Sequence, residues 1–437
     1  MKKGSIFSID LAIVIATLVL MLVGILFILS SNTDADGHMR DDEFIKQIIW
    51  AIFGIPILFF FAFFNYQRLR DISLILYIVF ILLLVITAVI GKKVNNARSW
   101  IGIGGFGIQA SEFAKLSTIL LLGEYLVRFK NRIHELLFFI AGFLICMLPM
   151  GLVLTQPDMG TALVFLPVFF VMTWIAGARR RHIFFIVISG FLMITISMIP
   201  EFQKFFLKTK LPVLNILTSF DYIFYVIGII SLIGALAFTG YYFLRDRIFY
   251  WICYASGVLF SSFLGSFFVR KVFSDYSTPK IRLIIFLDPT IDAKGSGWHI
   301  INSVLAVGSG GLFGKGFLEG TQSKLKYVPE QSTDFIFSII SEELGFLGGI
   351  IILSSFLVIL LRSVRILTHT TDQYAHFIGA GIIGMLLYHL VINIGMTMGI
   401  MPITGIPLFF VSYGGSSLLT GLISIGIILN IYFRRYS

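Results

Sequence analysis

Residues 11–29 read LAIVIATLVLMLVGILFIL, residues 72–90 read ISLILYIVFILLLVITAVI, and neither stretch contains a charged side chain. Each is close to the ~20 residues that an α-helix needs to cross ~30 Å of hydrocarbon. The whole chain has this character, because 57% of its 437 residues are hydrophobic, 13% are charged and the mean hydropathy is +0.95. A water-soluble domain needs a more polar surface. The sequence therefore predicts a protein whose solvent is lipid.

We predict an all-α, polytopic helical bundle of about 10–12 transmembrane helices that forms a single membrane domain over residues 1–437. The predicted spans cover residues 8–30, 46–64, 72–91, 112–127, 136–155, 160–177, 183–200, 222–244, 248–268, 345–361, 375–398 and 412–433. The first run is too long for a signal peptide and no small-residue cleavage site follows it, so we expect a retained helix. Cys146 and Cys253 lie in separate apolar segments, which argues against a disulfide or metal site.

Basic residues recur in every second short connection between the predicted spans. They are Lys2, Lys3, Arg68, Arg70, Arg128, Lys130, Arg132, Arg179, Arg180, Arg181, Arg245, Arg247, Arg362, Arg365, Arg434 and Arg435. By the positive-inside rule these connections, and with them both termini, are predicted to be cytoplasmic. The expected location is a bacterial inner membrane.

A second group of basic residues falls on the predicted outer side. It includes Lys92, Lys93, Arg98, Arg270, Lys271, Lys280, Arg282, Lys315, Lys324 and Lys326. One interpretation is a solvated loop attracted to anionic headgroups. The other is a binding surface for the phosphate or pyrophosphate of a lipid, because Arg and Lys are the usual ligands of such groups.

Residues 269–344 form a predicted outer loop that is too long to be a simple connection. Glycines stand among hydrophobic residues here, at 308–316 above all, which favours close backbone contacts and re-entrant segments. Asp334 follows the loop at the start of an apolar run. Two interpretations are open for it, an N-cap or a functional carboxylate at the membrane boundary. Glu342 and Glu343 are interpreted mainly as helix-end acids.

Several motifs together resemble the shape, elongation, division and sporulation (SEDS) family of polymerases from about residue 90 onward, apart from residues 201–268. They are Asn96-Ala-Arg98-Ser-Trp100, Gln109-Ala-Ser-Glu112-Phe-Ala-Lys115, Gln156-Pro-Asp158-Met-Gly160, Phe286-Leu-Asp288-Pro289, Gly297-Trp-His299, Gly308–Gly316, Pro329-Glu330, Thr333-Asp334-Phe335, Gly399–Pro407 and Val411-Ser412-Tyr413-Gly414. The match leans toward the rod-shape branch rather than the division branch. Ser332 stands where the family often has His, and residues 201–268 are expected to add a helix pair.

The resemblance implies a peptidoglycan glycosyltransferase that joins lipid II, an undecaprenyl-pyrophosphate-linked disaccharide-pentapeptide, into glycan strands with inversion at the anomeric carbon. It also implies a class B penicillin-binding transpeptidase as partner, in contact with membrane lipid, and no nucleic acid. A divalent cation (Mg²⁺ or Mn²⁺) is a further expectation, although the sequence contains no cation-cage motif.

Residue roles follow from the motif positions. Asp334 is the candidate base for the acceptor hydroxyl. The expected substrate-binding residues are Arg98, Trp100, Lys115, Arg282 and Lys315, of which the cations would stabilise the pyrophosphate. Glu112, Asp158, His299, Glu330, Thr333 and Ser412 are expected to support the site. Glu112 and Lys115 share a helix face, so a structural ion pair is an equal alternative for Lys115. Capping remains open for Asp158, and interfacial packing for His299.

Two functions of other classes compete with polymerisation. A lipid II flippase would require polar groups along a whole transmembrane path, whereas the ionisable groups here collect outside. The second is a scaffold that only activates the transpeptidase. Within the polymerase class, the alternative is a polymerase of the division branch.

Overall fold

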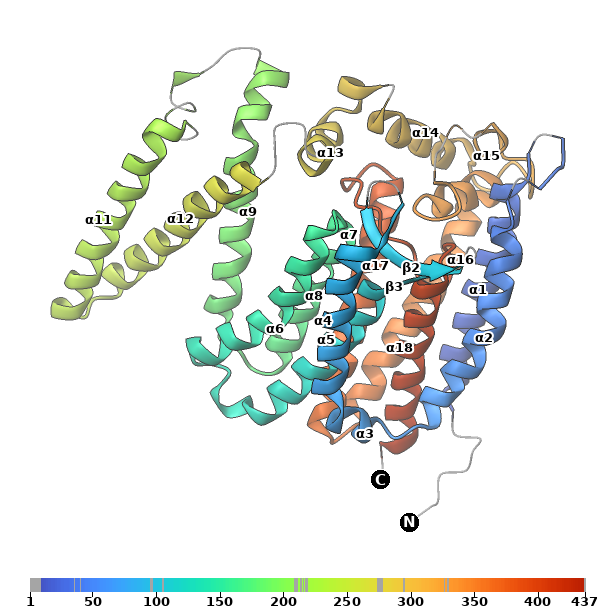
Figure 1. Ribbon diagram of the computed structural model, residues 1–437, viewed down its shortest axis with the longest axis horizontal. Coiled ribbons are helices and arrows are strands. Elements are labelled where there is room, and N and C mark those ends of the chain that lie inside the picture. Colours follow the sequence, from blue (N-terminus) through green and yellow to red (C-terminus); the bar gives the residue numbers. More distant parts are fainter. Residues whose placement is uncertain are drawn as a thin grey trace. The chain divides into compact units, whose positions relative to one another are not determined.

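The computed structural model describes the chain apart from residues 1–8, 35, 40, 95–96, 104–105, 208–210, 213, 215, 217–218, 273–277, 294, 326, 328–329 and 436–437. The chain divides into two compact units. Unit 1 comprises Met1–Ala178 and Ala293–Ser437, and unit 2 comprises Arg179–Asp292. Helices predominate in both units (Figure 1), which confirms the predicted all-α class.

Long apolar helices make up most of unit 1. They are α1 (Leu11–Asn32), α2 (Glu43–Phe63), α4 (Ser73–Ile90), α5 (Ala110–Arg128), α6 (Leu136–Thr155), α16 (Ile336–Thr368), α17 (Gln373–Thr397) and α18 (Gly415–Arg434). The shorter helices are α3 (Tyr66–Asp71), η1 (Lys130–Arg132), α7 (Met159–Leu163), α8 (Phe165–Ile175), α14 (Ser296–Ser309) and α15 (Thr321–Lys324). Every predicted span in this unit corresponds to one of these helices, except that 160–177 is shared by α7 and α8.

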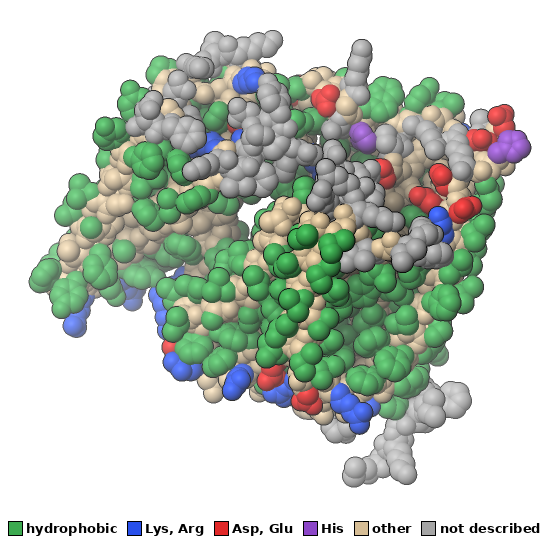
Figure 2. All heavy atoms as spheres, viewed as in Figure 1, with side chains coloured by type: hydrophobic (Ala, Val, Ile, Leu, Met, Phe, Trp, Pro, Cys, Tyr) green, Lys and Arg blue, Asp and Glu red, His purple; other side chains and the backbone are tan. Residues whose placement is uncertain are grey.

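The centre of unit 1 is formed by α17 and α18. In their most apolar windows 72% and 83% of the residues are buried, against 22% in α2 and α4. Helix α17 packs against α5, α8 and α16, while α18 packs against α2. Ten helices of the described residues, counting both units, are long and apolar enough to cross a membrane. Hydrophobic side chains cover the sides of these helices, as expected for contact with lipid (Figure 2).

Unit 2 is a smaller helical unit. It contains α9 (Arg180–Phe202), the π-helical turn η2 (Gln203–Leu207), α11 (Phe220–Leu244), α12 (Arg247–Val272), α13 (Thr278–Leu287) and η3 (Pro289–Asp292). The helix pair predicted within 201–268 is α11 and α12, and α12 packs against both α11 and α9. The buried pair Lys280–Glu201, with Nζ and Oε1 2.9 Å apart, joins α13 to α9.

A small sheet interrupts the helices of unit 1. Strands β1 (Lys92–Val94), β2 (Ala97–Ile103) and β3 (Phe106–Gln109) form an antiparallel meander in that order. Trp100 pairs with Gln109, and Gly107 lies under the Trp100 ring, so close that a Cβ there would come within 2.8 Å of the indole. No strand is predicted here from the sequence, because strands this short leave too little alternation to recognise.

The two ends of unit 1 differ in charge. At one end, which we call the basic end, Arg362 of α16 pairs with Asp10 before α1, and Arg70 of α3 pairs with Glu124 of α5. Figure 2 shows the Lys and Arg side chains of the visible face of unit 1 gathered mainly at this end. The sheet, α14 and α15 lie at the opposite end, which we call the outer end (Figure 1).

Helix α16 connects the two ends and has a kink at Gly345. This residue has φ 64° and ψ −151°, so residues 336–344 form a separate helical segment at the outer end. The part from 345 to 368 is roughly 36 Å long at ~1.5 Å per residue, enough to cross a bilayer core. The predicted span start at residue 345 coincides with the kink.

Glycines allow the outer segment to pack closely against this kink. A Cβ on Gly310 would lie 1.8 Å from the Ser341 carbonyl oxygen, and one on Gly314 would lie 2.0 Å from that of Glu343. The close backbone contacts predicted from the glycine-rich stretch are therefore present.

We expect Gly345→Ala to lower the unfolding temperature of the purified protein. Its left-handed backbone alone costs an alanine about 1–3 kcal/mol, and the new Cβ would come within 2.4 Å of the Gly314 nitrogen. Gly151→Ala in α6 is the control, because nothing lies within 4 Å of its added Cβ. Equal stability of both variants would contradict the kink's dependence on glycine.

Candidate active site

Asp334 lies in a turn, residues 331–335, that leads into α16 at the outer end of unit 1. Its side chain is half-buried, and its backbone N–H donates to the Glu330 carbonyl at 3.2 Å. The N-cap position of α16 is occupied by Phe335, whose side chain makes no cap hydrogen bond. Asp334 precedes this position by one residue.

Two neighbouring segments hold the backbone of this turn. The Tyr413 N–H donates to the Ser332 carbonyl at 2.8 Å. The side-chain amide of Asn393 on α17 donates to the Asp334 carbonyl at 2.9 Å and to the Ile406 carbonyl at 2.8 Å. Asn393 is completely buried. One amide thus joins the turn, α17 and the segment after α17.

A buried polar chain continues from Asn393 toward the middle of unit 1. His389, one helical turn away on α17, places Nδ1 3.0 Å from the Pro407 carbonyl and Nε2 3.2 Å from Lys115 Nζ. Because a carbonyl only accepts, Nδ1 carries the proton and Nε2 accepts from the ammonium. Lys115 Nζ also lies 2.8 Å from Glu112 Oε1, and both side chains are 1% exposed. The ion pair expected from the spacing is present, and it is sealed from solvent.

The segment after α17 is closed by its own hydrogen bonds. Ser412 is buried, and its hydroxyl accepts from the Leu408 N–H at 2.8 Å. Burial, and to a lesser degree the charge of Glu43, raises the pKa of Tyr413 to about 12, so its phenol is neutral at physiological pH. The hydrogen bond between the Ser412 hydroxyl and the Leu408 N–H fixes the shape of the segment that supports the Asp334 turn.

The sheet is anchored beside this segment. The Gln109 N–H donates to Ser416 Oγ at 2.9 Å, and the Gln109 side-chain amide donates to Asp158 Oδ2 at 2.8 Å. Asp158 also caps α7 by accepting from the Thr161 N–H at 3.1 Å, as the capping alternative predicted. Trp100 lies on β2, whereas the side chain of Arg98 lies outside the described residues.

Lys315 and Glu342 form a second cluster at the outer end. Lys315 Nζ lies 2.6 Å from Glu342 Oε1 and 2.7 Å from Thr321 Oγ1, and the lysine side chain is 29% exposed. Glu342 is fully buried and also accepts from the backbone N–H groups of Thr321 and Gln322 at 2.9 and 3.1 Å. The carboxylate thus holds the start of α15 against α16.

Glu343 makes the matching contacts beside it. It accepts from Ser30 Oγ on α1 at 2.5 Å, from the Leu318 N–H at 3.0 Å and from Ser323 Oγ at 3.2 Å. Both glutamates lie at the end of the helical segment 336–344, as predicted, and they fasten the outer segment to the bundle. Glu342 also balances the charge of Lys315.

Three of the remaining candidate residues lie near Asp334, and the fourth belongs to unit 2. His299 on α14 lies near Phe335, with ring centroids 6.1 Å apart. The Thr333 hydroxyl donates to the Glu330 carbonyl at 3.3 Å, and Glu330 has a left-handed backbone, φ 51°. Thr333 is next to Asp334 in the chain, and Glu330 lies four residues before it. Arg282 belongs to α13 of unit 2.

The described residues do not fit a protein-held metal site. They contain no group of three or more His, Cys, Asp or Glu side chains arranged to hold an ion. The roles of a divalent cation and of the phosphate-binding cations stay predictions.

The sequence analysis missed Asn393 and His389. Their spacing of four on one face of an apolar span was the available signal, because polar side chains at membrane depth need partners. What the sequence did not indicate was that these partners would be backbone carbonyls of the Asp334 turn and of residues 406 and 407.

Known proteins resemble this chain over its whole length. A family model of cell cycle proteins, named for FtsW, RodA and SpoVE, matches residues 10–215 and 201–437. The peptidoglycan glycosyltransferase RodA of Treponema pallidum is 43% identical over 435 residues, which cover 100% of both chains and include residues 201–268.

Two solved structures share the fold. A chain from a structure of a peptidoglycan synthase complex superposes with a TM-score of 0.68 at 24% identity, covering 99% of both chains. The rod shape determining protein RodA of Thermus thermophilus gives a TM-score of 0.61 at 22% identity, again covering 99% of both.

We expect Lys115→Met to destabilise the protein by about 3–5 kcal/mol, because it leaves the Glu112 carboxylate buried without its cation. The double variant Glu112→Leu, Lys115→Met should recover most of this loss, since no charge then remains buried. Thermal unfolding of the purified variants measures both. A double variant no more stable than the single one would contradict the sealed ion pair.

Proposed function

We propose a mechanism for this chain, which belongs to the family of cell cycle proteins that includes FtsW, RodA and SpoVE. It is a multi-pass membrane protein and a peptidoglycan glycosyltransferase of the rod-shape type. The proposal concerns its substrate, the residues that act on it and the side of the membrane on which they act.

The proposed substrate is lipid II, as both glycosyl donor and acceptor. The acceptor hydroxyl is a weak nucleophile at neutral pH, so a base that removes its proton accelerates attack. The Asp334 carboxylate takes this proton while the hydroxyl oxygen forms a bond to the anomeric carbon of the donor. The bond from that carbon to the pyrophosphate breaks on the opposite face, and the configuration inverts.

The position of Asp334 carries this proposal. Asp334 is half-buried at the outer end, and it stands on a turn whose backbone accepts hydrogen bonds from Asn393 and Tyr413. A base is effective only if it is held within hydrogen-bond reach of the proton that it removes. The hydrogen bonds to the turn supply this restraint.

Cations are proposed to stabilise the leaving pyrophosphate. Lys315 is the described candidate in unit 1, because its side chain is partly exposed at the outer end. Its bonds to Glu342 and Thr321 fix the position of the ammonium but also reduce its net charge. Arg98 and Arg282 are proposed from the sequence motifs. Lys115 fits better as the sealed partner of Glu112 than as a phosphate ligand.

We propose that the outer end faces away from the cytoplasm. Arg362 and Arg365 lie near the C-terminal end of α16, whereas Asp334 precedes its first residue. With the arginine-rich end inside, as the charge rule requires, Asp334 and the chemistry are outside and both termini are cytoplasmic.

A class B penicillin-binding transpeptidase is the proposed partner. A chain with a similar fold belongs to a peptidoglycan synthase complex that structurally coordinates polymerisation and crosslinking, and this supports the proposal. Coupling the two activities would pass the new glycan directly to the enzyme that crosslinks it.

Asp334→Ala and Asp334→Asn are each expected to lower polymer formation by at least about 10²–10⁴-fold, the usual contribution of a general base. The assay follows labelled lipid II with purified protein and a matching transpeptidase, and unfolding temperatures check that the variants fold. Asp41→Asn, an exposed acid just before α2, is the control. Undiminished polymer from either Asp334 variant would refute the base assignment.

Asn393→Ala is expected to lower kcat about 10-fold or more with little change in KM, because it frees the turn that positions Asp334 without touching substrate. Asn430→Ala is a matched control. Asn430 is equally buried and donates to the Phe61 and Phe64 carbonyls at the basic end. Each variant removes a buried amide that donates to two backbone carbonyls, so both should lose stability similarly. An equal loss of kcat in the two would show that Asn393 is only structural.

A further inference from the structure

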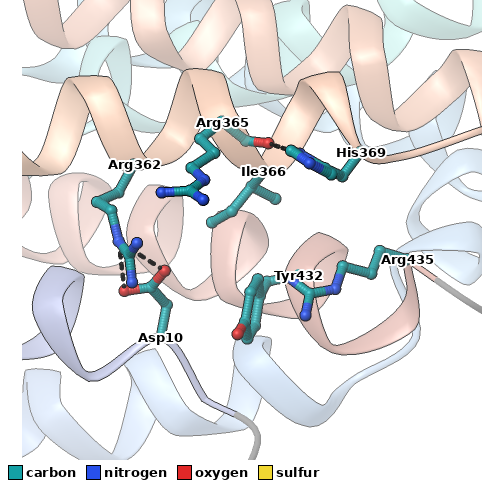
Figure 3. A pocket seen from close by; sticks show the side chains of 7 residues that line it. All are labelled: Asp10, Arg362, Arg365, Ile366, His369, Tyr432 and Arg435. Atoms are coloured by element: carbon teal, nitrogen blue, oxygen red, sulfur yellow. Dashed lines mark hydrogen bonds and ion pairs between the residues drawn. The ribbon is translucent and has the colours of Figure 1, made fainter.

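A cavity of about 270 Å³ opens at the basic end of unit 1, at the opposite end of α16 from Asp334 (Figure 3). Arg362, Arg365 and Ile366 line it from the C-terminal part of α16, and His369 lines it from just after that helix. Tyr432 and Arg435 line it from the end of α18, and Asp10 lines it from the start of α1. The mechanism proposed above uses none of these residues.

The lining carries an excess of positive charge. The lining contains three guanidinium groups and one carboxylate, that of Asp10, which already pairs with Arg362. Asp10 accepts from the Ala12 N–H at 3.2 Å as the cap of α1, and its Oδ2 lies 3.0 Å from Arg362 Nε. Figure 3 shows Arg362 and Arg365 descending from α16, while the guanidinium of Arg435 lies 3.9 Å above the Tyr432 ring centre. Cations gathered around a cavity favour an anionic ligand.

Helix capping does not account for Arg365. Basic residues near a helix C-terminus often bind its last carbonyls. Here the Arg365 carbonyl already accepts from the Thr368 hydroxyl at 2.9 Å, and His369 Nδ1 lies 2.8 Å from it. Among the described residues, the Arg365 guanidinium makes no hydrogen bond or ion pair, so it is available to a ligand in the cavity.

Apolar, lipid-facing surface adjoins the pocket. On α16, Leu361 is 59% exposed and Val364 is 47% exposed, and each neighbours a lining arginine in the chain. On α1, which packs against α16, Leu11 is 65% exposed and Ile15 is 59% exposed. A ligand with a charged head and long apolar chains fits this combination, whereas a soluble phosphate would use only the cationic part.

We propose that this pocket binds the phosphate of an anionic phospholipid, such as phosphatidylglycerol, whose acyl chains lie along the exposed faces of α1 and α16. Basic pockets between transmembrane helices are suited to such headgroups. The bound lipid would bridge the ends of α1, α16 and α18.

The test compares two double variants of the purified, full-length protein in mild detergent. Arg365→Gln with Arg435→Gln removes two charges from the pocket. Arg128→Gln with Arg132→Gln removes two exposed charges from the α5–η1 region outside it. Native mass spectrometry measures retention of added phosphatidylglycerol or phosphatidylcholine, and thermal unfolding measures stabilisation by each lipid, since a ligand of the folded state raises its stability.

We expect phosphatidylglycerol, and not phosphatidylcholine, to be retained by the wild type and by the Arg128/Arg132 variant. The pocket variant should bind phosphatidylglycerol about 30-fold more weakly, or roughly 5-fold per arginine lost, and lose the stabilisation that depends on this headgroup. Equal retention by both variants, or a stability loss in the pocket variant that leaves its headgroup preference intact, would overturn the proposal. Displacement of the lipid by equimolar inorganic phosphate would also overturn it.

Discussion

The hydrogen bonds of the Asn393 amide are the constraint on which the proposed site depends. Irregular backbone at the edge of a membrane-embedded bundle leaves carbonyls that neither lipid nor a helix can satisfy. Asn393 satisfies two of them, at Asp334 and Ile406, and so sets where the turn and the segment after α17 meet. His389 repeats this one helical turn deeper, where it joins the Pro407 carbonyl to the Lys115–Glu112 pair. Hydrogen bonds thereby connect the turn of the proposed base to the buried Lys115–Glu112 pair.

The long helix α16 connects the turn that carries Asp334 to the basic pocket at the opposite end of unit 1. Its kinked outer segment is fastened by Glu342 and Glu343, and the turn before it carries the proposed base. Its other end contributes three side chains to the basic pocket. The proposed chemistry at one end and the proposed lipid binding at the other therefore both depend on α16. Glycines at 310, 314 and 345 make this possible, because a side chain at any of them would collide with backbone.

Much of this architecture follows from the sequence. Apolar runs of membrane-crossing length located the spans, and the Glu112–Lys115 spacing predicted the ion pair, because each signal depends on local periodicity. The sheet was missed because three short strands have little period-two signal. The Glu342 and Glu343 clamps and the partners of Asn393 were missed for a different reason. They join residues up to 313 positions apart, and no pattern within one helix reveals such contacts.

Everything proposed for catalysis requires Asp334 to face the outer side, and thiol labelling in intact cells measures this most directly. Two single-cysteine variants are treated with a membrane-impermeant thiol reagent, with the native Cys146 and Cys253 replaced by Ala. One is Thr333→Cys, beside the proposed base, and the other is His369→Cys, at the basic end. Our account predicts that Thr333→Cys reacts in intact cells and that His369→Cys reacts only after permeabilisation. The opposite pattern would place the carboxylate in the cytoplasm and contradict the mechanism.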